Sequence, residues 1–108
     1  MNLKSASYVS NGVFISPAIP AVNQEVRITY NGLLFRNGAS DIYAHVGFGN
    51  NWNPTVNYRM RRSEQGFEVS IPIDRYTDNL NICFKDSADN WDNNCGSNYS
   101  FPVKKNTA

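Results

Sequence analysis

Two tryptophans stand inside polar, turn-forming segments, where aromatic rings are unusual. Trp91 lies within 86–99, a run rich in Asn and Asp, and Trp52 lies within 45–54, a second Asn-rich run. Such residues favour turns over strand or helix interiors. A flat ring held in a polar loop is partly exposed, and beside amides it suits an amphipathic ligand. The alternative is that Trp91 tucks under its own loop as a satellite of the core.

His45, the only histidine, is predicted to share a surface with Trp52. Alternate residues from 42 to 46 are apolar, which sends Tyr43 and His45 to the opposite, outer face of the same strand. That strand leads directly into the Trp52 loop. An exposed histidine is ordinarily without a role, but its position beside two aromatic side chains makes it a candidate binding residue.

The chain lacks the residue patterns of common hydrolytic enzymes. No G-x-S-x-G signature accompanies His45. Asp89 and Asp92 could in principle supply the two carboxylates of a glycosidase, but a chain this short has little with which to build a cleft. The acidic loop also lacks EF-hand spacing, and its Asp and Asn are better explained as turn formers. We therefore expect no catalysis, no metal and no cofactor.

Cys83 and Cys95 are the only cysteines, and a disulfide between them would hold the Trp91 loop in place. In the loop-entropy model, closing a loop of about a dozen residues stabilises the fold by roughly 3 kcal/mol. Two free thiols are the alternative. A zinc site is not expected, because two Cys and one distant His lack the number and spacing of zinc ligands. A disulfide would favour an oxidising compartment.

Apolar residues alternate with polar ones along most of the chain, and no stretch carries a sustained helical stripe. In one of the expected strands, 57–62, Met60 should face the core and the arginines should face solvent. We expect strands around 9–15, 25–30, 41–47, 57–62, 67–73, 80–85 and 99–103.

About seven to nine short antiparallel strands favour an immunoglobulin-like β-sandwich, with a small closed barrel as the alternative. A length of 108 residues fits a single domain, 1–108, with its core over about 8–104 and frayed ends.

The charge balance excludes whole classes of partner. A formal net charge of +1 gives no general field for nucleic acid or an anionic membrane, and the basic run Arg59–Arg62 is the only local excess. No apolar run approaches the length of a membrane span, and Met1–Ser5 lacks a signal core. The chain is thus expected to be intracellular or a module of a longer exported protein, and monomeric.

Three separated motifs occur in order along the chain: 30–33, 42–47 leading to Trp52, and 84–86 leading to 91–94 and 98–99. Together they resemble the starch-binding carbohydrate-binding modules of families twenty-five and fifty-three, and more distantly family twenty-six. The resemblance extends over about 22–103.

This resemblance implies an immunoglobulin-like sandwich that binds α-1,4-glucans such as starch, glycogen and malto-oligosaccharides without cleaving them. Such modules are usually appended to secreted bacterial amylases, which implies an extracellular location. An exposed aromatic platform with flanking amides would make the site. The implied ligand-binding residues are His45, Trp52 and Trp91, then Tyr43 from the family twenty-six pattern, and the amides Asn93 and Asn94, with Asn50 and Asn51 less directly.

A structural or protein-binding immunoglobulin-like spacer is the alternative function. Asn is frequent throughout this chain, so Asn-rich loops could arise without a ligand.

Overall fold

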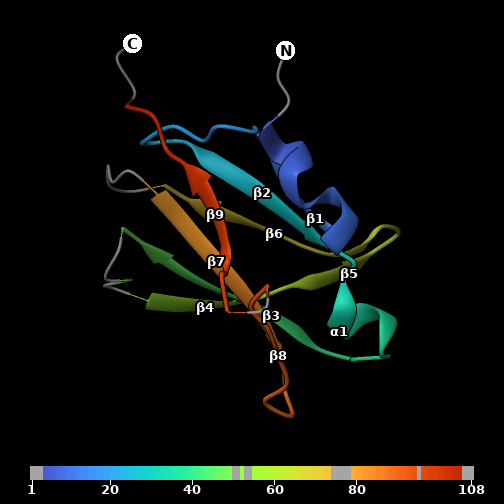
Figure 1. The fold of residues 1–108 in the computed structure, drawn as a ribbon. Helices are drawn as coiled ribbons and strands as arrows, with labels where there is room; N and C mark the ends of the chain where they lie inside the picture. The colour runs from blue at the N-terminus through green and yellow to red at the C-terminus, as the bar shows by residue number, and fades with distance from the viewer. Residues whose placement is uncertain (1–3, 50–51, 53–54, 74–78, 95, 106–108) are drawn as a thin grey trace.

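Nine strands form two antiparallel sheets that pack face to face in the computed structural model, which describes residues 4–49, 52, 55–73, 79–94 and 96–105 (Figure 1). The first sheet has the order β1-β2-β6-β5, and the second has the order β4-β3-β7-β8, with β9 also paired to β7. The predicted all-β sandwich is confirmed, and the closed barrel is wrong. The strand bounds are β1 Val13–Ser16, β2 Glu25–Tyr30, β3 Ile42–Phe48, β4 Thr55–Arg59, β5 Arg61–Ser63, β6 Gly66–Pro72, β7 Asn79–Asp86, β8 Trp91–Asp92 and β9 Tyr99–Pro102.

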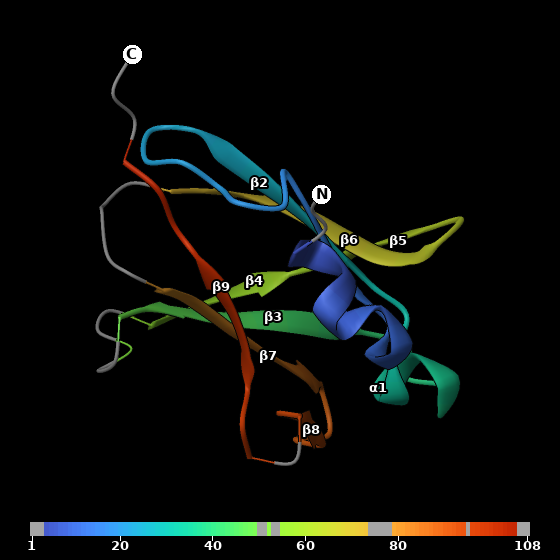
Figure 2. The same ribbon diagram turned by 45° about the horizontal axis from the view of Figure 1, so that its top comes forward.

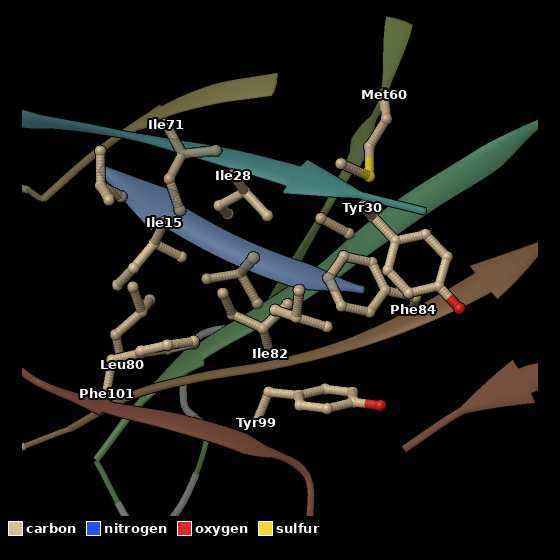
Figure 3. Packing of buried hydrophobic residues seen from close by; sticks show 14 of the residues in the cluster. Ile15, Ile28, Tyr30, Met60, Ile71, Leu80, Ile82, Phe84, Tyr99 and Phe101 are labelled. Atoms are coloured by element: carbon tan, nitrogen blue, oxygen red, sulfur yellow. The ribbon is translucent and has the colours of Figure 1, made fainter. Parts of the chain in front are cut away.

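The core lies between the two sheets and follows the alternation seen in the sequence (Figure 3). Along β2, Val26, Ile28 and Tyr30 are fully buried, while the residues between them point outward. The same alternation runs along β3, where Ile42 and Ala44 are fully buried. One face of each strand is thereby fixed in the core, which leaves the other face of β3 and β7 for a surface site.

The N-terminal segment differs from the prediction of a strand over 9–15. Lys4–Asn11 form a 3-10 helix, and β1 begins only at Val13. The chain turns between them at Gly12, which has a φ of +79°, a conformation that glycine adopts readily. A Cβ at this position would lie only 2.7 Å from the Asn31 carbonyl carbon. Tyr8 then packs its ring edge-on against Tyr99, with 5.1 Å between centroids.

The expected strand 57–62 is wrong as a single strand. The chain breaks it at Met60, so that β4 belongs to one sheet and β5 to the other. The Met60 side chain is buried as predicted, and its amide donates to the Ile42 carbonyl at 2.9 Å. The neighbouring arginines are exposed as expected, with Arg59 paired to Asp41 at 2.9 Å.

A short helix, α1 (Leu33–Arg36), follows β2 and was not predicted. It contacts β7 and β8 at one end of the sandwich (Figure 2). No helix among the described residues has the length and apolar character needed to cross a membrane.

Candidate functional site

The outer face of the second sheet carries His45 at its centre. The imidazole is partly exposed, as its parity in β3 predicts, and its backbone pairs with Asn57 of β4 on one side and Cys83 of β7 on the other. His45 Nδ1 lies 2.5 Å from Asn57 Oδ1. Because an amide oxygen only accepts, Nδ1 donates its proton in this contact, and Nε2 is the other polar atom of the ring.

Both tryptophans converge on His45. The Trp52 ring lies 5.9 Å from the imidazole, centroid to centroid, at an interplanar angle of 29°. The Trp91 ring lies 5.2 Å away at 87°. Two planes that make these angles with one ring differ from each other by at least 87° minus 29°, or 58°. The two indoles of this aromatic cluster (His45, Trp52 and Trp91) are therefore strongly angled.

Trp52 packs against Gly47, a position of β3 that has no side chain. Gly47 faces outward in β3, and a Cβ placed there would lie 2.8 Å from both Cα and Cε3 of Trp52. Trp52 itself has a positive φ of 57°, and its carbonyl accepts a hydrogen bond from the Thr55 hydroxyl. Asn50 and Asn51 lie outside the described residues, so their predicted role stays a prediction.

Lys85 links Tyr43 to Trp91. Trp91 in β8 pairs with Lys85 in β7, and the Trp91 residue is 43% exposed. The Lys85 Nζ lies 5.1 Å from the Tyr43 ring centroid and 5.8 Å from the Trp91 ring centroid. It also pairs with Asp89 at 3.4 Å. The Lys85 side chain is 16% exposed, and its ammonium attracts both rings by cation–π interaction.

The turn that leads into Trp91 is organised by Asp86. Its carboxylate accepts hydrogen bonds from the backbone amides of Ala88 and Asn90 and from the Asn90 side chain, each at 2.9 Å. These donors, the Asn90 side chain first, hold the pKa of Asp86 below its usual value. The carboxylate thus stays ionised and keeps the β7–β8 hairpin closed.

The residue after Trp91 is anchored in the core. Asp92, read as a turn former in the sequence, is 7% exposed and accepts from the Tyr30 hydroxyl at 2.5 Å and from the Tyr99 hydroxyl at 2.8 Å. Both hydroxyls point the same way at the end of the core in Figure 3. Burial, and then the bond to Asp92, raise the pKa of Tyr30. The Tyr30 oxygen also accepts from the Leu34 amide at 3.0 Å, so one contact point holds β2, β8 and α1 together.

Asn93 and Asn94 follow β8 on the side of α1. The Asn93 side-chain oxygen accepts from the Gly96 amide at 3.0 Å, and the Asn94 side-chain nitrogen donates to the Asn98 carbonyl at 3.0 Å. Both line, with Trp91, a pocket that α1 borders. The structure therefore places these amides next to Trp91, while their described hydrogen bonds run within their own loop.

Cys83 lies on the outer face, as its parity predicts, yet is only 6% exposed. Burial, and then the charge of Asp92, raise the pKa of its thiol to about 11. The predicted disulfide stays a prediction, because Cys95 lies outside the described residues. In the described part of the chain, no group of three or more His, Cys, Asp or Glu is arranged to hold a metal ion.

Residues 26–82 match the family of starch/carbohydrate-binding modules numbered 53. The chain belongs to carbohydrate-binding module family 53. The resemblance inferred from the three sequence motifs is confirmed. The matched range of this family 53 module holds His45, Gly47 and Trp52, whereas Trp91 lies beyond it.

The module is also 30% identical over 94 residues to an α-amylase of Clostridium acetobutylicum. The alignment covers 87% of the module and 12% of the amylase, so the module spans a small part of that relative. No solved structure matches the module significantly.

Proposed function

We propose that this module binds α-1,4-glucans, namely starch, glycogen and malto-oligosaccharides, without cleaving them. The aromatic cluster is the platform, Tyr43 extends it, and Asn93 and Asn94 supply flanking amides. The observation that supports this most strongly is the angle of at least 58° between the two indole planes, obtained from their 29° and 87° angles to His45.

The chemistry of glucose explains why this cluster suits it. A glucose ring has an apolar C–H face that packs on an indole, and a rim of hydroxyls that needs fixed donors and acceptors. His45 Nε2 and the neighbouring amides can serve that rim. An α-1,4 chain curves from one residue to the next, so angled rings follow it, whereas coplanar rings would suit flat cellulose.

The amylase relative suggests the context in which the module works. We propose that it acts within, or beside, a secreted amylase-type glycoside hydrolase and so outside the cell, holding the enzyme near its polysaccharide. The module would act as a monomer with a glucan as its partner, and not nucleic acid or a membrane, since its net charge is only +1.

Binding should be weak for a single module. A flexible oligosaccharide loses conformational freedom on binding, and its hydroxyls exchange water for protein. We expect micromolar to sub-millimolar dissociation constants, about −5 to −8 kcal/mol.

Calorimetric titration with maltoheptaose, with cellohexaose as the control sugar, tests the proposal. We expect heat with maltoheptaose alone, and an affinity weakened about 30-fold or more in Trp52→Ala and Trp91→Ala variants whose circular dichroism matches the native protein. Binding of cellohexaose instead would contradict the α-1,4 assignment. Silence with both sugars at millimolar concentration would leave the spacer function as the better account, and release of reducing sugar from soluble starch would contradict a non-catalytic role.

A further inference from the structure

Beyond the aromatic cluster, a groove runs between α1 and the β7–β8 hairpin. It consists of two adjoining pockets, of about 490 and 420 Å³, and both are lined by Leu33 and Trp91. Asn37 and Asn90 line the first pocket, and Arg36 lines the second together with Asn93 and Asn94, the flanking amides of the proposed site. We call these two pockets together the α1 groove. The ends of α1 and β8 that border it lie at the same end of the sandwich in Figures 1 and 2.

We propose that the α1 groove is a second glucan subsite, into which a malto-oligosaccharide bound on the aromatic cluster continues past Trp91. This inference rests on the proposed function and extends it from a platform to a longer binding surface.

Trp91 makes the two surfaces continuous. It meets the edge of the His45 ring, 5.2 Å between centroids, and it also lines both pockets of the groove. A chain stacked on the aromatic cluster therefore reaches the groove without leaving the surface of Trp91. The pockets have the size of ordinary small-ligand sites, about 300–1,000 Å³.

The lining has the mixed character that a sugar ring requires. Leu33, 51% exposed, and Trp91, 43% exposed, offer apolar surface for C–H faces. Asn37 and Asn90 in one pocket and Arg36 in the other offer polar groups for hydroxyls. The apolar residues that line the two pockets are mixed with polar ones, unlike the broad apolar patch that marks a protein interface.

Both walls of the groove are held in place before any ligand binds. Asp86 closes the hairpin wall through three hydrogen bonds of 2.9 Å. The Tyr30 hydroxyl fixes the other wall, since it accepts from the Leu34 amide in α1 and donates to Asp92 in β8. A rigid groove spends little binding energy on ordering its own walls, which favours a weakly bound, flexible glucan.

The dependence of affinity on chain length tests the subsite. We would titrate maltotriose and maltoheptaose into the native module and into Leu33→Ala, with Ile19→Ala as the control. Ile19 is also an exposed apolar residue, at 38% exposure. It lies in the loop before β2, whereas Leu33 begins α1, which follows β2. We expect Leu33→Ala to weaken maltoheptaose three- to tenfold and to change maltotriose less than twofold, and Ile19→Ala to change neither.

Asn37→Ala is a second variant, because it removes only an exposed amide and leaves the apolar contact intact. It should weaken maltoheptaose selectively in the same way. Equal loss with both sugars, or no loss with either in both variants, would overturn the subsite.

Trp52→Ala separates this inference from the proposed function. If it weakens binding of both sugars strongly while Leu33→Ala and Asn37→Ala change neither, the aromatic cluster binds glucan and the groove does not. If Trp52→Ala leaves both affinities unchanged, the proposed function itself fails and the subsite fails with it.

Discussion

Replacing Gly47 with alanine should push Trp52 away from β3 and weaken glucan binding. The added Cβ would lie 2.8 Å from Trp52 Cα and Cε3 and 2.9 Å from its Cβ, about 0.6 Å inside the 3.4 Å at which ordinary contact begins. One of these atoms belongs to the Trp52 backbone, so turning the side chain does not relieve the clash. The whole residue must move away from the sheet, and its angle to His45 must change.

The expected size of the effect follows from what Trp52 contributes. Truncating an anchoring aromatic costs on the order of 2 kcal/mol of binding free energy, which is about 30-fold in Kd. We expect Gly47→Ala to lose at least half of that free energy, or about fivefold or more. The free energy of unfolding should change by less than about 1 kcal/mol, because the clash is with Trp52 on the outer face of the sheet and not with the core.

A double-mutant cycle with maltoheptaose measures whether the loss passes through Trp52. If the mechanism is right, Gly47→Ala costs affinity in the native background and almost none in Trp52→Ala, because the displaced ring is already absent. Native affinity in Gly47→Ala would refute the steric argument. Equal losses in the two backgrounds would show that Gly47 acts on the ligand by another route.

Three further predictions concern the supports of the site. Tyr30→Phe removes the donor to Asp92 and leaves the Leu34 amide without its acceptor, so the free energy of unfolding in urea should fall by about 1–3 kcal/mol; an unchanged midpoint would contradict the anchor. In reduced native protein at pH 8, Cys83 should react with iodoacetamide about 100-fold more slowly than in urea, because its pKa is raised to about 11. The neutral thiol stabilises the fold below pH 9, and this stabilisation is lost as the pH rises towards 11. Asn57→Ala frees the His45 ring and should weaken maltoheptaose severalfold in calorimetry, whereas unchanged affinity would show that the ring needs no such support.

The sequence alone predicted the parts of this fold that depend on local alternation. Side chains of a strand alternate between its faces, so the apolar residues of β3 identified the core side and placed Tyr43 and His45 on the outer side. The motifs then identified the family correctly. Parity also placed Cys83 on the outer face, but it could not predict how deeply the neighbouring residues cover Cys83.

Features that depend on distant partners could not be predicted. Asp92 looked like one more turn former, since nothing near it reveals that the Tyr30 hydroxyl, 62 residues away, lies against its carboxylate. The break at Met60 leaves the alternation intact while moving the chain from one sheet to the other. With only four residues, α1 is too short to show a helical period.

Tryptophan fluorescence tests most directly whether glucan binds on the aromatic cluster, because the chain has only two tryptophans and both belong to that cluster. We expect maltoheptaose to shift the emission with a saturable dependence in the native module and in each single-tryptophan variant, Trp52→Phe and Trp91→Phe, and cellohexaose not to shift it. Emission that stays constant at maltoheptaose concentrations where calorimetry records binding would place the glucan elsewhere on the module and contradict binding on the aromatic cluster.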